Sequence, residues 1–139
     1  MNDTGINQLF GPAGDVGRWH RATVRRVRAE IVKRAPVDTG RLRSSWLVKH
    51  WGITSGNRLV STIYTDVNYA NYVIMGTGIY AGKGWITPKS KQFLRFRGRG
   101  GAWVFARRVR GQRPNNFVQD GLMAGAGATH KIRLAVPRR

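Results

Sequence analysis

The sequence predicts an α+β fold: a long N-terminal helix packed on an antiparallel β-sheet of about four strands, with a short C-terminal helix and extended terminal arms. Three observations support this prediction. Apolar residues recur at helical spacing before Pro36, β-branched and aromatic runs separated by Gly-rich turns follow it, and a last apolar segment follows Pro114. We expect a flexible arm over 1–14, a single domain over 15–126 and a basic tail over 127–139.

The composition is strongly basic. Lys and Arg number 25 against 6 Asp and Glu in 139 residues, a formal net charge of +19. Such a surface attracts polyanions, or it complements acidic neighbours in a large assembly, and composition leaves both open. The absence of Cys excludes disulfides and Cys-based zinc sites. We also expect no membrane segment, because no apolar run approaches roughly 20 residues. We expect no secretion signal, because the N-terminus has neither a basic region nor an apolar region of the required kind.

Residues 15–34 carry the pattern of the long helix. Trp19, Thr23, Val27 and Ile31 recur at steps of four, so they share one face. A second side of the helix is basic, with Arg18, Arg21, Arg25 and Arg28. This stripe is either a solvated face or a binding surface.

The helix should end at Pro36, because proline cannot donate the next hydrogen bond and excludes helical geometry from the residue before it. Asp38 or Thr39 is expected to cap a short helical turn on which Leu42 and Trp46 share one face. A role for Asp38 in a catalytic triad is the less favoured alternative. We therefore assign structural roles to Asp38, Thr39, Gly40, Leu42 and Trp46.

Four segments have strand composition: 47–53, 59–65, 92–97 and 102–106. The first two are joined by a turn-rich linker, and the last two by Gly98 to Gly101, so two antiparallel hairpins are expected. The Gly-Arg-Gly-Gly turn also resembles an element that grips single-stranded nucleic acid, although a hairpin tip is favoured.

A short helix over 69–75 should end at Gly76, and a flexible glycine-rich loop should follow over 78–84. This loop lacks the spacing of a phosphate-binding P-loop, because Gly84 follows Lys83 where Ser or Thr is required. The final helix should run from residue 115 to about 125, with inner positions at Phe117, Gly121 and Met123. Its glycines make it a poor helix by propensity, so packing must hold it.

No set of residues predicts catalysis. His20, His50 and His130 are scattered without metal-ligand spacing, and six carboxylates over the whole chain give no paired acids. The serines lack the G-x-S-x-G context of a nucleophile elbow. We expect no enzyme activity, no cofactor and no small-molecule substrate.

Four blocks in order carry a resemblance to a known family: Ala35 to Ser45, Val67 to Val73 running into Gly76-Thr77, Pro88 with Phe93-Leu94-Arg95-Phe96, and Val109 to Phe117. This ordered set resembles the neck and tail-completion (head–tail joining) proteins of long-tailed bacteriophages over about residues 20–125. Ile74-Met75 departs from the family, in which an acidic residue is common shortly before the Gly-Thr pair.

The resemblance implies a non-catalytic α+β subunit that assembles into a hexameric or dodecameric ring between the capsid connector and the tail, through which DNA passes. Expected partners are head-completion or stopper proteins, tail-terminator proteins and DNA in the lumen. The expected location is the neck or tail of the virion, after assembly in the host cytoplasm. The alternative is a basic nucleic-acid-binding module that uses the Arg-rich helix and segment 89–113.

Interface residues are expected in the glycine-rich loop and the N-terminal arm, at Gly76, Thr77, Gly78, Tyr80, Gly82, Lys83, Trp85, Leu9 and Phe10. Residues expected to face DNA or an acidic partner lie on the first helix and in the later basic segment, at Arg18, Arg21, Arg25, Arg28, Arg97, Arg99, Arg107 and Arg108.

Overall fold

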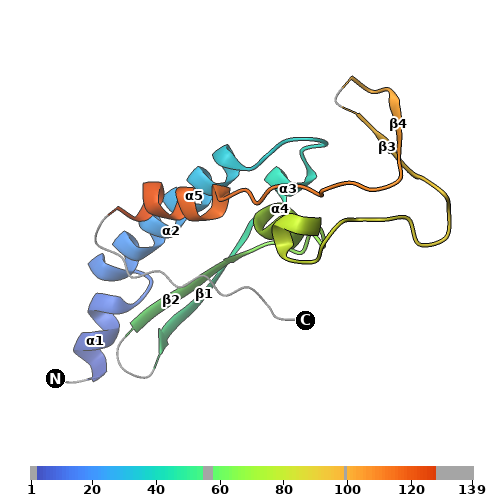
Figure 1. Ribbon diagram of the computed structural model, residues 1–139. Coiled ribbons are helices and arrows are strands. Elements are labelled where there is room, and N and C mark those ends of the chain that lie inside the picture. Colours follow the sequence, from blue (N-terminus) through green and yellow to red (C-terminus); the bar gives the residue numbers. More distant parts are fainter. Residues whose placement is uncertain (1–2, 55–57, 99, 128–139) are drawn as a thin grey trace. The chain divides into compact units, whose positions relative to one another are not determined.

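A computed structural model describes residues 3–54, 58–98 and 100–127 of the chain (Figure 1). The α+β class is confirmed, with a long helix near the N-terminus, antiparallel strands and a short C-terminal helix. The expectations for Arg99 and for the tail beyond Gly127 lie outside the described residues.

The chain divides into two compact units. We call residues 1–68 together with 116–139 the helix–sheet unit, and residues 69–115 the ribbon unit. This division is finer than the single domain that we expected over 15–126.

Two helices open the helix–sheet unit, α1 over Asp3–Phe10 and α2 over Asp15–Arg34. Residues 3–10, expected in a loose arm, are therefore helical. The turn between the helices is tight, because a side chain at Gly17 would collide with the backbone of Gly11. Figure 1 shows α1 continuing into α2 through this turn.

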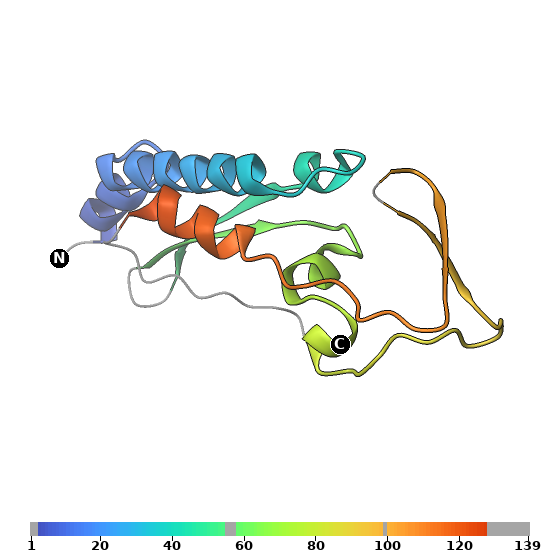
Figure 2. The same cartoon turned by 45° about the horizontal axis from the view of Figure 1, so that its top comes forward.

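The core forms where α2 packs against α5, which spans Phe117–Ala126. Figure 2 shows the two helices side by side over the strands of the same unit. Together the two helices and the segment that follows α2 bury a group of largely apolar side chains: Thr23, Val24, Val27, Ile31, Ala35, Leu42, Trp46, Phe117 and Val118.

The predicted buried faces of the two helices are wrong at two residues. Trp19 shares the spacing of Thr23 and Val27, yet 52% of its surface is exposed. The reason is that α5 ends at Ala126, next to the position that meets Val27, and does not extend to Trp19. Met123 is 72% exposed, because the glycines on either side of it turn the opposite face of α5 toward α2.

The joint after α2 contains α3, over Arg41–Ser44. Gly40 occupies the N-cap in the left-handed conformation (φ 80°), and no side chain caps the helix, so the expected cap from Asp38 or Thr39 is wrong. Asp38 and Thr39 precede the N-cap position, which Gly40 occupies. The left-handed conformation at this position favours glycine, because glycine lacks a Cβ. Leu42 is buried as expected, with 4% of its surface exposed.

Trp46 connects the joint to the core. Its ring packs edge-on against Phe117, with centroids 5.9 Å apart and an interplanar angle of 76°. The Nε of Arg28 donates a hydrogen bond to the Trp46 carbonyl oxygen at 2.7 Å. Trp46 thus contacts both α2 and α5.

Strands β1 (Leu47–Thr54) and β2 (Arg58–Tyr64) form the predicted antiparallel hairpin. The register shifts between His50 and Gly52, and Gly52 adopts a positive φ of 76°. Exposure alternates along β2, as expected when one face of a sheet is covered and the other is open.

The ribbon unit begins with α4 (Ala70–Met75), which ends at Gly76 as predicted, and the 3-10 helix η1 (Gly78–Ala81). Strands β3 (Leu94–Arg97) and β4 (Trp103–Ala106) then pair as the second hairpin. Among the described residues, β1 pairs with β2 and β3 with β4, so the single four-stranded sheet is corrected to two two-stranded sheets. The strands of each hairpin pair only with each other, and the two hairpins belong to different compact units.

Candidate binding surfaces

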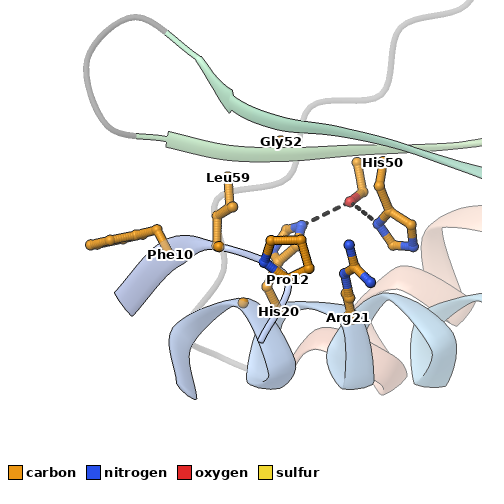
Figure 3. A pocket seen from close by; sticks show the side chains of 10 residues that line it. Phe10, Pro12, His20, Arg21, His50, Gly52 and Leu59 are labelled. Carbon is orange, nitrogen blue, oxygen red and sulfur yellow. Dashed lines mark hydrogen bonds between the residues drawn. The ribbon is translucent and has the colours of Figure 1, made fainter. Parts of the chain in front are cut away.

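The helix–sheet unit contains a basic pocket between α2 and the β1–β2 hairpin (Figure 3). The Ser61 hydroxyl oxygen of β2 lies between two imidazoles, 2.8 Å from Nε2 of His20 and 2.7 Å from Nδ1 of His50. Because a hydroxyl carries one proton, at least one of the imidazoles donates to Ser61. This bridge ties α2 to both strands.

Two adjoining cavities, of about 320 and 340 Å³, share Arg21 and His50. Arg18 and Arg25 line the second cavity, one turn before and after Arg21 on the same side of α2. Neither cavity is lined by a carboxylate among the described residues. The arrangement suits an anion, since guanidinium groups bind phosphate or carboxylate oxygens through charge-assisted hydrogen bonds.

Four predicted residues of this unit have distinct surroundings. Arg18 pairs with Asp15 one turn earlier, at 2.5 Å on the exposed surface. Phe10 lines the first cavity, whereas Leu9 is 47% exposed beside it on α1. Arg28 is half-buried, and its Nε donates to the Trp46 carbonyl oxygen, so it also takes part in the joint.

The glycine-rich loop of the ribbon unit is held by backbone hydrogen bonds. Thr77 N donates to Gln112 O at 2.9 Å, and Ile79 N donates to Arg110 O at 3.0 Å. The Thr77 hydroxyl accepts from Gln112 N at 2.8 Å. The first half of this loop is thus clasped to a later segment, and our expectation of a flexible loop is wrong there.

Glycine is required at the clasp for steric reasons. Gly76 has a φ of 77°, and a Cβ there would lie 2.7 Å from Gln112 O. Gly78 has a φ of 63°, and a Cβ added there would collide with the backbone of Arg110. Gly82 has open space around it and takes a left-handed turn after η1, while Lys83 beside it is exposed.

Arginines stack on aromatic rings along the ribbon unit. Arg95 and Arg97 lie over the Trp103 ring, with Cζ 4.3 and 5.0 Å from its centroid. Further pairs join the other arginines of this segment to exposed or half-buried rings: Arg107 with Phe93 at 5.8 Å, Arg108 and Arg110 with Trp85 at 4.5 and 5.8 Å, and Arg113 with Tyr80 at 5.6 Å.

Sequence reasoning named Arg97, Arg107 and Arg108 for this surface but omitted Arg95, Arg110 and Arg113. The missed signal is the interleaving of aromatic and Arg residues across segment 85–113, which favours stacking when both types share a strand face.

Tyr80 shows the electrostatic effect of this crowding. A hydrogen bond with the Arg113 side chain lowers the pKa of the Tyr80 phenol below its ordinary value, and the charges of Arg113 and Arg110 act in the same direction. The phenolate form is favoured because it accepts from a cation.

The predicted interface residues fall into two groups. Leu9, Phe10 and the arginines of α2 belong to the helix–sheet unit, whereas the residues from Gly76 to Trp85 and the later arginines belong to the ribbon unit.

The described residues contain no group of three His, Cys, Asp or Glu side chains placed to hold a metal. No helix in the described ranges is both long and apolar enough to cross a membrane.

Residues 14–76 match the model of the family HK97-gp10_like, whose description is "Bacteriophage HK97-gp10, putative tail-component". The matched segment holds α2, the joint, the β1–β2 hairpin and α4. No curated protein matches the chain, and no solved structure matches it. The resemblance to phage tail-associated proteins that the sequence predicted is therefore confirmed, and the match supports a structural role in a phage virion.

Proposed function

We propose that this chain is a structural subunit that forms a ring in the neck or head–tail joining region of a tailed phage, connects the capsid connector to the tail and permits DNA passage. The match of residues 14–76 to a tail-component family carries the proposal. The matched segment supplies most of the core-forming side chains, so the likeness concerns the scaffold of the subunit.

Two uncovered faces that carry large apolar side chains support assembly into a ring. The outer face of the β1–β2 hairpin exposes large side chains, with exposed fractions of 44% at Leu47, 37% at Val60 and 37% at Tyr64. In the ribbon unit, Phe96 and Val104 are 40% and 38% exposed on paired positions. Different surfaces that each need a partner suit a heterologous contact, which closes into a ring when the rotation allows.

The charge constrains what such a ring surrounds. Copies of a chain with net charge +19 repel one another, so a ring requires counter-charge from DNA or from acidic neighbours. Head-completion or stopper proteins on one side and tail-terminator proteins on the other are the partners that we propose for the two ring faces.

The mass of the purified full-length chain tests the proposal, measured by native mass spectrometry and negative-stain imaging with and without duplex DNA and the neighbouring neck proteins. We expect ring-sized particles that Tyr64→Lys abolishes, because a charge would be buried in the contact. Met123→Lys is the matched control, since Met123 is exposed on the face of α5 that points away from α2. Monomers under every condition, with DNA binding that falls steeply with salt, would support the nucleic-acid-binding alternative instead.

A further inference from the structure

The β3–β4 hairpin has two chemically different faces. Alternation along antiparallel strands places Arg95, Arg97, Trp103 and Phe105 on one face, with Arg97 opposite Trp103 and Arg95 opposite Phe105. The other face is wholly apolar, with Leu94, Phe96, Val104 and Ala106. We call the first the Arg–Trp face.

The Arg–Trp face concentrates positive charge in a segment that has no acidic residue. Two guanidinium groups share the ring of Trp103, and residues 69–115 contain no Asp or Glu. The same segment holds ten basic residues: Lys83, Lys89, Lys91, Arg95, Arg97, Arg99, Arg107, Arg108, Arg110 and Arg113. A guanidinium stacked flat on a ring still presents its in-plane N–H donors outward, where they can bind an anion.

A second copy of the chain is a poor occupant for this face. The rest of the sequence holds fifteen of the 25 basic residues and all six acidic ones, so it is also net positive. Charge complementarity therefore indicates a different, anionic molecule.

Duplex DNA fits this face better than an acidic protein or a single strand. A two-stranded ribbon has dimensions that the major groove admits, and a uniformly cationic face complements a polymer whose repeating charges are all negative. A protein partner would be expected to meet a mixture of charges. Unpaired bases would need the ring faces for stacking, and guanidinium groups already cover a face of Trp103.

We propose that the Arg–Trp face of the β3–β4 hairpin binds the phosphate backbone of duplex DNA, with Arg95 and Arg97 as the phosphate ligands and Trp103 as the platform that orients them. This inference rests on the proposed function, because a ring that permits DNA passage supplies the duplex. The inference names the surface of the subunit that contacts the duplex, which the proposed function does not specify.

Fluorescence anisotropy with a labelled duplex tests the proposal, using the full-length chain over a series of salt concentrations. Arg95→Gln/Arg97→Gln should reduce the slope of log K against log salt by about 1.8, because each lost phosphate contact removes about 0.9. Arg95→Lys/Arg97→Lys should restore the slope, since the charge returns, with weaker binding because the planar group is lost. Val104→Thr, on the apolar face, should leave the slope unchanged, and circular dichroism verifies folding of each variant.

Lys33→Gln/Arg41→Gln is the charge-matched control, because it removes two positive charges from exposed positions at the end of α2 and the start of α3, outside the candidate binding surfaces. Equal slopes for the two Gln double variants would mean that binding follows net charge alone, which would overturn the proposal. Preference for the single strand, or Arg95- and Arg97-dependent binding of poly-L-glutamate in place of the duplex, would also overturn it.

Particle mass, measured on the same samples, separates the failure of this inference from the failure of the proposed function. Rings without this DNA contact refute only the inference, whereas DNA binding by a chain that never forms rings refutes the proposed function.

Discussion

Replacement of Gly121 by Ala tests the close packing of α5 on α2. Gly121 is buried against the backbone of α2, and an added Cβ would lie 2.8 Å from both N and Cα of Ile31 and 2.7 Å from its Cγ1. Carbon atoms in favourable contact are about 3.5–4.0 Å apart. Because these atoms include helix backbone that cannot move alone, α5 must shift away from α2 by roughly 1 Å.

Two opposing effects set the size of the change. Alanine is favoured over glycine in a helix interior by about 1 kcal/mol. Overpacking of a core costs about 1–3 kcal/mol, and a shift of α5 also disturbs the ring contact between Phe117 and Trp46. We expect the steric effect to dominate, with a net loss of about 1–2 kcal/mol that lowers Tm by roughly 3–8 °C in a chain of this size.

Thermal unfolding followed by far-UV circular dichroism measures the change. Gly5→Ala in α1 is the control, because no atom lies within 4 Å of its added Cβ. This control should leave Tm unchanged or raise it slightly, since only the helix propensity differs. If Gly121→Ala has a Tm equal to or above that of the unsubstituted chain, the close approach of the two helices is refuted.

Three further predictions concern the joint and the ribbon unit. Trp46→Ala should lower the free energy of unfolding by about 3–5 kcal/mol in a denaturant titration, because it leaves a cavity in the core; a loss below 1 kcal/mol, on the scale of a surface change, would contradict the burial. The phenol of Tyr80 should titrate below its ordinary pKa of about 10 in an ultraviolet pH titration. Its ionised form stabilises the fold at pH values above the ordinary pKa, and this effect is lost as pH falls through the lowered value. Arg113→Gln should raise the pKa of Tyr80 toward its ordinary value, while Arg110 still lowers it; an unchanged pKa would exclude the pairing. Gly78→Ala should destabilise the ribbon unit by more than 1 kcal/mol through collision with the backbone of Arg110 and strain at positive φ, measured as faster amide hydrogen exchange there; unchanged exchange would disprove the clasp.

The Gly78 prediction follows from the correction of the loop that we expected to be flexible over 78–84. Gly82 and Gly84 have open space for a Cβ, but their φ values of 71° and 76° are in the left-handed region, so a substitution there is also strained. Lys83 and Trp85, which are exposed, are the better sites for assembly tests.

The sequence by itself determined the local elements and the surface charge. The spacing along residues 15–34, the stop at Pro36, the end of α4 at Gly76 and the two hairpins follow from interactions between residues close in the chain. These patterns depend on backbone geometry and turn chemistry, which neighbouring residues dictate. The excess of basic residues is likewise independent of the fold.

Only the tertiary structure decided which elements meet. Two hairpins with the same alternation can join one sheet or remain separate, and residue types alone do not select between these pairings. The bridge from His20 through Ser61 to His50 joins residues that are distant in sequence. The fit of Gly121 against Ile31 arises for the same reason, because long-range packing chooses among partners that local sequence leaves equivalent.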